Sequence, residues 1–339
     1  MLSDKTSDLK IISSCLVILT GLAISFALYF ARPILVPFAF AIFLSYAIAP
    51  IAEVLQKQLR LPRIPSVCIA IFCGLLMLIL IGLLIYSSVS GLADNMELYQ
   101  KKVGQIAGTL TAFLEKLMGD LDANAIEKTF GDLPIAEIIQ RTIGNFAAIL
   151  ANFFLIVIFV IYLVFGRNPK TITQGIYGEI DQKVRKYIAP KIIISAVTGF
   201  LVGFTLWLLG LKLALVFGIL AFLLNLIPNI GSIVATLLPI PLALVQFDSY
   251  TRVLLVLLIP GTIQMTIGNF IEPKILGDSL ELHPVTILLA LIFWGMVWGV
   301  MGLFLAAPIT AVIKIVLEQI GYTRSIAHLM AGRLQETRQ

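Results

Sequence analysis

Charged side chains, histidines and catalytic motifs are scarce in this sequence. Charged residues make up 13% of its 339 residues, whereas soluble chains average roughly a quarter. It contains neither an H-E-x-x-H motif nor a G-x-x-x-x-G-K-[ST] loop, which argues against a membrane zinc protease and against ATP hydrolysis on the usual phosphate-binding loop. Gly231–Ser232 lacks the flanking pattern of a serine nucleophile elbow. We therefore expect a protein that is not an enzyme and that binds no cofactor or metal.

Long apolar segments dominate what is present. Apolar residues make up 59% of the chain, and its mean hydropathy is +1.02. The three cysteines lie inside apolar segments, as small packing residues do. Because a span of the ~30 Å hydrocarbon core needs about 20 apolar residues, the pattern predicts an all-α, polytopic transmembrane protein of about eight spans with broken or re-entrant helices. The expected helices cover residues 11–31, 33–55, 65–90, 143–166, 190–210, 212–227, 230–247 and 251–271.

The last apolar block, residues 284–318, is too long for one simple span. A glycine-rich break at Gly299–Gly302 divides it, so we interpret it as a helical hairpin. Its first half, 284–300, fits either a span or a re-entrant loop, and so do residues 230–247.

The distribution of charge divides the chain into parts and orients them. Fifteen of the 24 Lys and Arg residues fall in segments on the same side as the N-terminus, so the positive-inside rule places both termini in the cytoplasm. The largest polar segment then lies outside, where it forms either a cap over a pathway or a packed helical hairpin. The parts are three N-terminal transmembrane helices (1–90), an extracytoplasmic amphipathic helical module (91–142), a fourth transmembrane helix with a cytoplasmic amphipathic linker (143–189), a C-terminal transmembrane core with broken helices (190–320) and a cytoplasmic tail (321–339).

The stretch NLIPNIGSIVATLLP interrupts an apolar region with helix-breaking residues. Pro228, Asn229 and Gly231 separate its two apolar halves, and Ser232 follows them. Proline removes a backbone donor, and glycine permits conformations that end a helix. Transporters commonly bind cargo at half-helix ends of this kind. A tight turn at the membrane surface is the alternative interpretation.

Polar residues form a stripe on the apolar segment that precedes Glu272. Thr262, Thr266 and Asn269 follow one another at i, i+4 and i+7, so they share a helix face. Glu272 comes about one turn later, and Asn225 lies just before the proline break. Polar groups in spans often act only as interhelical contacts. Three of them on one face, leading to a carboxylate, favour a hydrated path.

The stretch IEPKILGDSLELHP, which follows, carries five ionisable groups. A carboxylate at the edge of a span, here Glu272, is costly and indicates a functional site by default. Lys274 lies two residues away, which does not make it a helical neighbour of that carboxylate. His283 precedes a proline that suits the first position of a helix. Asp278 and Glu281 are expected to face solvent on the inner side, and an ordinary wet loop is the alternative for the whole stretch.

Four motifs follow one another in a specific order between about residue 180 and residue 317. They are an isoleucine-proline-x-x-glycine element, an E-P-K-x-x-G element, an L-x-H-P element and a late glycine-rich hairpin that ends in Ala-Pro. With these motifs the chain resembles the autoinducer-2 (AI-2) exporter family, the PerM-like membrane permeases. The family elements fall on Pro228, Gly231, Glu272, Pro273, Lys274, Gly277, His283, Pro284, Gly299, Gly302 and Pro308.

The resemblance implies a multi-span transporter of a prokaryotic inner membrane that assembles as a homo-oligomer, such as a pentamer. Some members of the family are associated with export of AI-2, a small polar furanose derivative, and others with exchange of sodium or lithium for protons. The chain departs from many relatives, which have IPYIGP where it has Asn229 and Ser232. It also has Asp278 and Glu281 where many have a basic or small residue and a glycine, and these added carboxylates lean toward cation or proton coupling.

Three functions fit these observations. The first is a secondary transporter that exports a small hydrophilic solute such as AI-2, coupled to protons through Glu272. The alternative is a sodium(lithium)/proton antiporter in which Asp278 or Asp248 assists that residue, and the third is a scaffold whose outer module binds a partner. The expected partners are the lipid bilayer, a small polar solute or a monovalent cation, protons and further copies of the chain, with no nucleic acid. The candidate pathway residues are Asn225, Pro228, Asn229, Gly231, Ser232, Thr262, Thr266, Asn269, Glu272, Pro273, Lys274, Gly277 and His283.

Overall fold

The computed structural model describes residues 2–93, 146–166, 175–277 and 279–333. These residues form helices and no β-strand, which confirms the all-α class for them. The outer module expected at 91–142 lies outside the described residues, apart from the end of α3. The elements are α1 (Leu2–Phe30), α2 (Arg32–Gln58), α3 (Arg63–Ala93), α7 (Phe146–Gly166), α8 (Gly175–Leu208), α9 (Ala214–Asn225), α10 (Ile230–Leu237), α11 (Ile240–Gln246), α12 (Tyr250–Thr266), η1 (Ile267–Ile271), α13 (Glu272–Leu276), α14 (Pro284–Trp298), α15 (Val300–Gln319), η2 (Gly321–Thr323) and α16 (Arg324–Met330).

Three helices in the described part of the chain are long and apolar enough to cross a membrane. They are Gly178–Leu208, Tyr250–Leu276 and Val300–Gln319. Ile18–Phe30 and Arg32–Ile48 are together long and apolar enough for a fourth span. They are bent by 83° at Ala31, so they form either one broken span or a re-entrant loop. Five further apolar helical stretches in the part of the chain that was searched are 10–17 residues long, which is shorter than the roughly 20 residues of a simple span. Two of them, Ile64–Leu76 and Phe154–Gly166, are parts of the longer helices α3 and α7.

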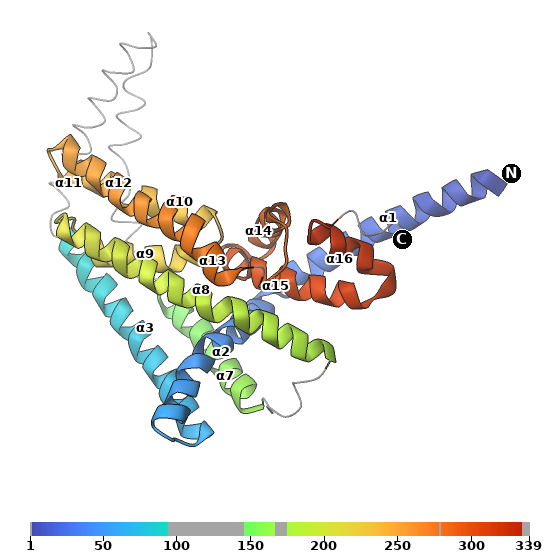
Figure 1. Ribbon diagram of the computed structural model, residues 1–339, viewed down its shortest axis with the longest axis horizontal. Coiled ribbons are helices and arrows are strands. Elements are labelled where there is room, and N and C mark those ends of the chain that lie inside the picture. The colour runs from blue at the N-terminus through green and yellow to red at the C-terminus, as the bar shows by residue number, and fades with distance from the viewer. Residues whose placement is uncertain (1, 94–145, 167–174, 278, 334–339) are drawn as a thin grey trace, which may run out of the picture. The chain divides into compact units, whose positions relative to one another are not determined.

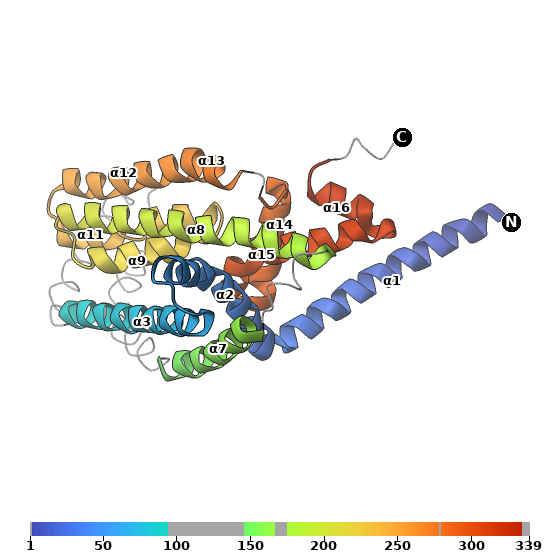
Figure 2. The ribbon, with the colours of Figure 1, turned by 60° about the horizontal axis from the view of Figure 1, so that its bottom comes forward.

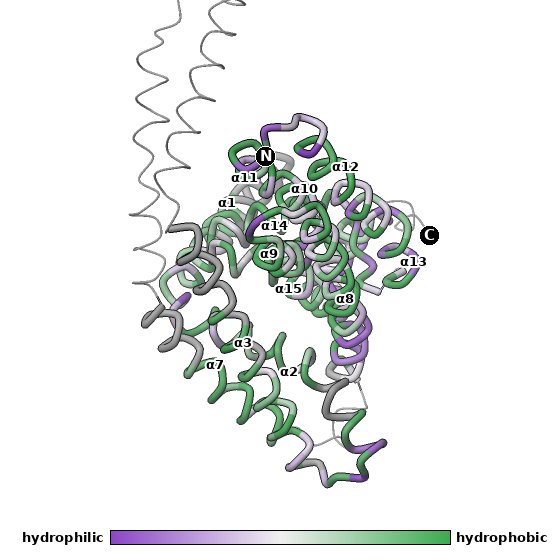
Figure 3. Tube along the Cα trace, turned by 90° about the vertical axis from the view of Figure 1, so that its left-hand side faces the viewer, coloured by the Kyte–Doolittle hydropathy of each residue, from purple (hydrophilic) through white to green (hydrophobic). Residues whose placement is uncertain are grey.

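Helix α8 runs without interruption through a position where a new helix was expected to begin. Its first part is hydrophilic and its continuation hydrophobic (Figure 3). Pro190 lies inside it, and proline is tolerated within membrane helices because neighbouring helices and water satisfy the freed backbone groups. The helix predicted to begin at residue 190 therefore begins at Gly175.

The chain divides into two compact units. The first comprises Met1–Ala47, Asn152–Ile188 and Asp278–Gln339, and the second comprises Ile48–Ala151 and Ala189–Gly277. Both α2 and α8 contribute residues to each unit.

The first unit contains a tight hairpin of α14 and α15 (Figure 1). Gly299 forms the turn with φ +64°, a conformation that favours glycine. A Cβ atom on Gly302 would lie 1.9 Å from the carbonyl oxygen of Trp294, so only glycine permits this approach of the two helices. The indole Nε1 of Trp294 donates to Thr310 Oγ1 over 3.2 Å. The hairpin predicted from the break at Gly299–Gly302 is confirmed.

In the second unit, α8 and α9 approach closely where glycines meet. A Cβ atom on Gly199 would lie 2.6 Å from the carbonyl oxygen of Gly218, and one on Gly218 would lie 2.8 Å from Gly203 Cα. The glycine pair of α8 thus serves a contact within the chain, as small residues do between membrane helices. Helices α12 and α13 run alongside α8 (Figure 2). The buried core of this unit consists of Val202, Leu206, Leu211, Ala214, Phe217, Ala221, Ala235, Ala243 and Val256.

Candidate functional site

The break predicted around residue 228 is a tight turn between α9 and α10 in the second unit. Asn229 adopts a positive φ of +61°, which few residues other than glycine and asparagine accept. A Cβ atom on Gly231 would lie 1.7 Å from the carbonyl oxygen of Leu224. Because glycine carries no Cβ, α10 can fold back along α9, and its first residues come to lie beside α12.

The two open ends of this helical hairpin are tied together by one side chain. Gln246, at the end of α11, donates from Nε2 to the carbonyl oxygen of Gly210 over 2.6 Å. Its Oε1 accepts from the backbone N–H of Lys212 over 2.7 Å. The loop before α9 therefore lies next to the end of α11, and the turn at Asn229 lies at the opposite end of the hairpin.

One face of the helix α12–η1–α13 borders a cavity. Gly261, Gln264, Gly268 and Glu272 follow at i, i+3, i+7 and i+11, so they project from one side. Between them the helix passes through a π-helical stretch, Ile267–Ile271. Such stretches are rare in proteins, and those that occur often lie at functional sites.

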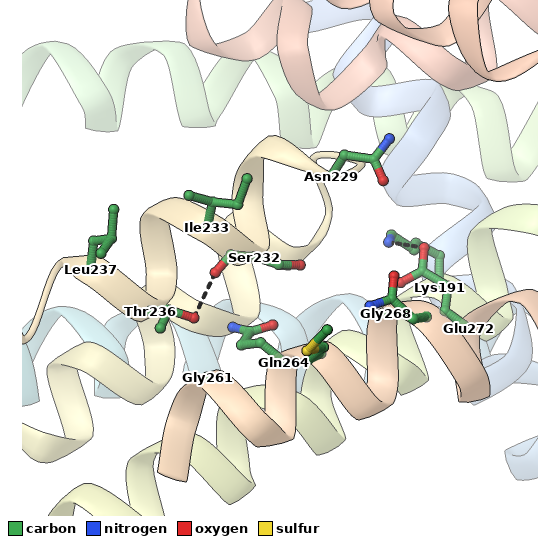
Figure 4. A pocket seen from close by; sticks show the side chains of 12 residues that line it. Lys191, Asn229, Ser232, Ile233, Thr236, Leu237, Gly261, Gln264, Gly268 and Glu272 are labelled. Atoms are coloured by element: carbon green, nitrogen blue, oxygen red, sulfur yellow. Dashed lines mark hydrogen bonds and ion pairs between the residues drawn. The ribbon is translucent and has the colours of Figure 1, made fainter. Parts of the chain in front are cut away.

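The cavity measures about 460 Å³ and lies among residues of α8, α10 and α12–α13 (Figure 4). Its volume falls within the roughly 300–1,000 Å³ of small-molecule sites. Both polar and apolar side chains line its walls. The lining residues are Lys191, Asn229, Ser232, Ile233, Thr236, Leu237, Gly261, Gln264, Met265, Gly268, Asn269 and Glu272.

The carboxamide of Gln264 lies in this cavity without a protein partner. The side chain is 4% exposed, and neither its Nε2 nor its Oε1 makes a hydrogen bond. Among the side chains that the structure describes, no other has a buried polar atom in this state. Figure 4 shows the group between α12 and the α10 residues Ser232 and Thr236. Because an unpaired buried amide is costly, this group calls for a hydrogen-bonding occupant of the cavity.

A buried ion pair also borders the cavity. Lys191 Nζ on α8 bonds to Glu272 Oε1 at the start of α13 (Figure 4). The lysine side chain is 2% exposed and the glutamate 19%. The two charges cancel, so the cavity wall carries no net charge. Removal of either partner would leave an uncompensated charge in a poorly hydrated place.

The sequence itself matches a known family of membrane proteins. The AI-2E family transporter profile matches residues 16–321. The chain belongs to the AI-2E transporter family. It is 28% identical over 319 residues to the AI-2 transport protein TqsA of Escherichia coli K12, which covers 91% of this chain and 92% of TqsA. It is 26% identical over 335 residues to the permease PerM of the same organism, with 92% of this chain and 94% of PerM covered.

Membership of the AI-2E family confirms the resemblance and makes this chain a multi-pass membrane transporter rather than an enzyme. Four of the residues singled out in the sequence line the cavity of this transporter. They are Asn229, Ser232, Asn269 and Glu272. They come from two segments some forty residues apart that the fold brings together.

The threonines of the polar stripe lie off the cavity. Thr262 and Thr266 are exposed, and Thr262 Oγ1 donates to the carbonyl oxygen of Leu258 on its own helix. Asn225 is 2% exposed, and its Nδ2 donates to Ser195 Oγ over 3.1 Å. It thus links α9 to α8, the interhelical role that polar groups often have in membranes.

The remaining AI-2E family positions flank the cavity or belong to the first unit. Pro228 and Gly231 form the turn before α10. Pro273 and Lys274 follow Glu272 and are exposed, and Gly277, with φ +50°, ends α13. In the first unit, His283 caps α14, its Nδ1 accepting from the backbone N–H of Val285 over 3.3 Å.

The cavity also contains residues that sequence analysis missed. Thr236 was not noticed, and Lys191 was treated only as one of the inner cations. The glycines and the glutamine of α12 form the pattern Gly261-x-x-Gln264-x-x-x-Gly268, in which small residues flank an amide on one face. This pattern could have indicated the cavity-facing side of α12. A threonine can bond to a carbonyl oxygen of its own helix, whereas a mid-helix glutamine beside glycines has no such partner.

The carboxylates considered as helpers of Glu272 lie elsewhere or outside the description. Asp278 is not among the described residues. Asp248 precedes α12, at the other end of that helix, about 36 Å from Glu272 by the 1.5 Å rise per residue. Glu281 belongs to the first unit, where it pairs with Lys314 over 2.9 Å and with Lys183 over 3.1 Å. The hydrogen bond from Lys314, with the contribution of Lys183, lowers the pKa of Glu281 to about 2.

Proposed function

We propose that the protein exports a small hydrophilic solute such as AI-2, with the cavity of the second unit as its transport site and the proton as its coupling ion. TqsA, an AI-2 transport protein by name, supports the choice of solute. The observation that carries the proposal is the cavity itself. It places hydrogen-bonding side chains, an unpaired carboxamide and a neutralised ion pair beside a broken helix, which is how transporters hold polar cargo.

The ion pair offers a route for proton coupling. When Glu272 takes up a proton, its bond to Lys191 loses the charge that stabilises it, and the buried ammonium group is left without compensation. Such a charge is costly, so a conformation that exposes Lys191 to water becomes relatively more stable. Release of the proton restores the pair and the starting conformation. Proton binding thereby shifts the population between two states that open the cavity to different sides.

The helical hairpin of α9, α10 and α11 fits a re-entrant element. Helix α9 has 12 residues and extends about 18 Å, which is less than the ~30 Å core. Both open ends of the hairpin meet at Gln246. We therefore place its turn at depth, beside Glu272, and its ends at the outer surface. Of the eight predicted membrane segments, the sixth and seventh then form one hairpin, and the remaining orientation is unchanged.

The wider arrangement in this proposal is that of a prokaryotic inner-membrane protein. Both termini lie in the cytoplasm, where the cations gather, and residues 91–142 form a helical module outside. The five parts of the chain keep the boundaries given by their charge and hydropathy, except that α8 (Gly175–Leu208) runs through the one at residues 189–190. Copies of the chain associate into a homo-oligomer. The transport site itself is formed by residues of one copy.

A double substitution tests the coupling without leaving a buried charge. In Lys191→Gln/Glu272→Gln, two amides replace the ion pair and can still hydrogen bond. Purified protein in liposomes is given a pH gradient, and AI-2 flux is measured between pH 5 and 8. The wild type is expected to move AI-2 in a pH-dependent manner, and the double variant to lose that dependence. An unchanged pH dependence in the variant would exclude this pair as the coupling site.

A sodium(lithium)/proton antiporter is the second candidate, because oxygen-bearing side chains line the cavity and such oxygens bind small cations. The ammonium group of Lys191 on Glu272 opposes cation binding there, and we therefore favour the solute exporter. In the same liposomes, dequenching of a pH-sensitive dye by sodium or lithium, with no AI-2 flux, would reverse this preference.

A further inference from the structure

We infer that Gln264 is the specificity-determining residue of the cavity and that the site selects uncharged solutes with a hydrogen-bond donor and acceptor on adjacent atoms, as in a vicinal diol. The inference rests on the proposed function, because it names the class of solute that the transport site accepts. Three features of the described residues carry it: an unpaired carboxamide, the space beside it and the absence of net charge on the wall.

The carboxamide presents a donor and an acceptor side by side. Its Nε2 and Oε1 are both without a partner and are covered by neighbouring atoms, so a ligand that reaches them when α10 and α12 part can pair with both without breaking a hydrogen bond of the protein. A vicinal diol matches this arrangement, since one hydroxyl group accepts from Nε2 while its neighbour donates to Oε1. A single hydroxyl group leaves one of the two atoms unsatisfied, and an apolar solute leaves both unsatisfied.

Two glycines leave space at this group. Gly261 and Gly268 lie at i−3 and i+4 from Gln264, on the same helix face. A Cβ atom added at Gly268 would lie 3.9 Å from Ser232 Oγ, and one added at Gly261 would lie 3.4 Å from Thr236 Cγ2. An added methyl group at either glycine would thus already be in van der Waals contact with α10, so a larger side chain there would close the space that a solute needs when it binds next to the carboxamide.

The rest of the wall suits an uncharged, hydroxyl-rich solute. On α10, Thr236 Oγ1 donates to the carbonyl oxygen of Ser232, so this hydroxyl oxygen remains free to accept. The charged lining residues are Lys191 and Glu272, which already pair with each other. A charged solute would have to break that pair to find a counter-ion, which leaves the other partner uncompensated. The site therefore disfavours anions and cations alike.

Ribose, 2-deoxyribose and ribose 5-phosphate test both parts of the inference, the first two as their methyl furanosides so that the 2-deoxy sugar keeps no vicinal pair. They differ in one hydroxyl group of a vicinal pair or in net charge. Binding to the full-length protein in lipid nanodiscs is measured by calorimetry. We expect ribose to bind at least about tenfold more tightly than 2-deoxyribose, because a site built to bond a hydroxyl group rejects the analogue that lacks it. Ribose 5-phosphate is expected not to bind.

The variant Gln264→Leu is expected to reduce the preference for ribose over 2-deoxyribose to about onefold, since no amide remains to read the hydroxyl pair. Thr262→Val, one face away on the same helix, is the matched control and should keep the preference. Failure of ribose to bind, equal binding of the two sugars to the wild type, or an unchanged preference in Gln264→Leu would each overturn the inference.

Thermal unfolding separates recognition from a structural role. Because Gln264 makes no hydrogen bond within the protein, its replacement by leucine should leave the Tm unchanged or raise it. A residue that held the helices together would lower the Tm on removal. A lowered Tm together with an unchanged sugar preference would assign Gln264 to structure alone.

Blocking the cavity distinguishes failure of this inference from failure of the proposed function. In Gly268→Leu the new side chain fills the space beside Gln264, and AI-2 flux in liposomes is the readout. If Gly268→Leu stops flux and Gln264→Leu leaves it unchanged, the cavity is the transport site and the specificity assignment is wrong. If neither variant changes flux, the cavity is not the transport site.

Discussion

The side chain of Lys191 is 2% exposed, and Glu272, 81 positions further along the chain, compensates its charge. A buried ion pair contributes little net stability relative to well-packed neutral side chains, but half of such a pair is strongly unfavourable. The charges of the cavity wall are therefore coupled, and neither residue can be changed alone without a cost to the fold.

Single substitutions in this pair are expected to destabilise the protein more than the double substitution. Glu272→Gln leaves the ammonium group of Lys191 buried without a counter-ion, which should cost about 3–5 kcal/mol. Lys191→Gln/Glu272→Gln removes both charges and should recover most of that loss. Unfolding by denaturant in detergent measures the three free energies.

Lys274, a cation close to Glu272 in the sequence, provides the control for these single and double substitutions. Lys274 is exposed and lies two residues after Glu272, so Lys274→Gln should leave the unfolding midpoint unchanged. If the losses of the two single variants simply add in the double variant, the pair does not act as a unit.

Sequence analysis identified Glu272 but not its partner. A carboxylate in an apolar segment is conspicuous by composition alone. The partner depends on how α8 and α13 lie side by side, which no local pattern contains. Lys274 is the nearest cation along the chain, but it is exposed, and the cation that pairs with Glu272 comes from α8.

At the scale of elements, the turn between α9 and α10 depends on one missing Cβ atom. Gly231→Ala would place a methyl group 1.7 Å from the carbonyl oxygen of Leu224, so the backbone of the hairpin must shift. We expect a loss of about 3 kcal/mol or more, at the upper end of overpacking effects, together with loss of AI-2 flux.

A second glycine serves as the matched control for that substitution. Gly74 lies inside α3 with no atom within 4 Å of an added Cβ. Gly74→Ala should raise the free energy of unfolding by about 0.5–1 kcal/mol, because alanine loses less conformational freedom in a helix. Equal effects of the two substitutions would show that the close contact at Gly231 is not present in the protein.

The helical elements differ in how far local signals determined them. The breaks at Pro228–Gly231 and at Gly299 were predicted, because glycine and a positive φ at a turn are local properties. The break expected at Pro190 does not occur, since a proline in a long helix can be accommodated by its surroundings. The pathway face of α12 was assigned to Thr262 and Thr266, each of which lies two residues from Gln264 and therefore about 160° away from it around the helix.

At the scale of the whole molecule, the re-entrant hairpin makes a prediction about sidedness. In a variant without Cys15, Cys68 and Cys73, new cysteines at Lys212 and Ser249 mark the two open ends of the hairpin. An impermeant maleimide reagent should label both from the same side, the outer one in our proposal. Labelling from opposite sides would mean that α9 to α11 cross the membrane an odd number of times.

An ion-pair cluster predicts how the stability of the first unit depends on pH. Glu281 joins Lys183 at the start of α8 to Lys314 of α15, and these bonds lower its pKa to about 2. A carboxylate with a lowered pKa stabilises the fold fully above its ordinary pKa of about 4.5 and loses this effect as the pH falls toward 2. The Tm should therefore be insensitive to this group between pH 5 and 8.

The variant Glu281→Gln tests that assignment. It should lower stability at pH 7 by about 1–3 kcal/mol, because two lysines lose a charged partner, and it should weaken the loss of stability between pH 4.5 and 2. A pH profile of Tm that matches the wild type in shape and height would contradict a role for the cluster.

The sequence by itself determined that this is an all-helical membrane protein, that its helices break at Pro228–Gly231 and Gly299, and that Glu272 is a carboxylate in an apolar segment. These properties follow from composition, from glycine and proline, and from the cost of a charge among apolar residues, all of which act locally. Only the tertiary structure decided that Lys191 neutralises Glu272 and that Gln264 lies unpaired opposite Ser232 and Thr236. Both depend on the rotation and approach of helices distant in sequence, where a shift of one residue turns a side chain by about 100° and away from the cavity.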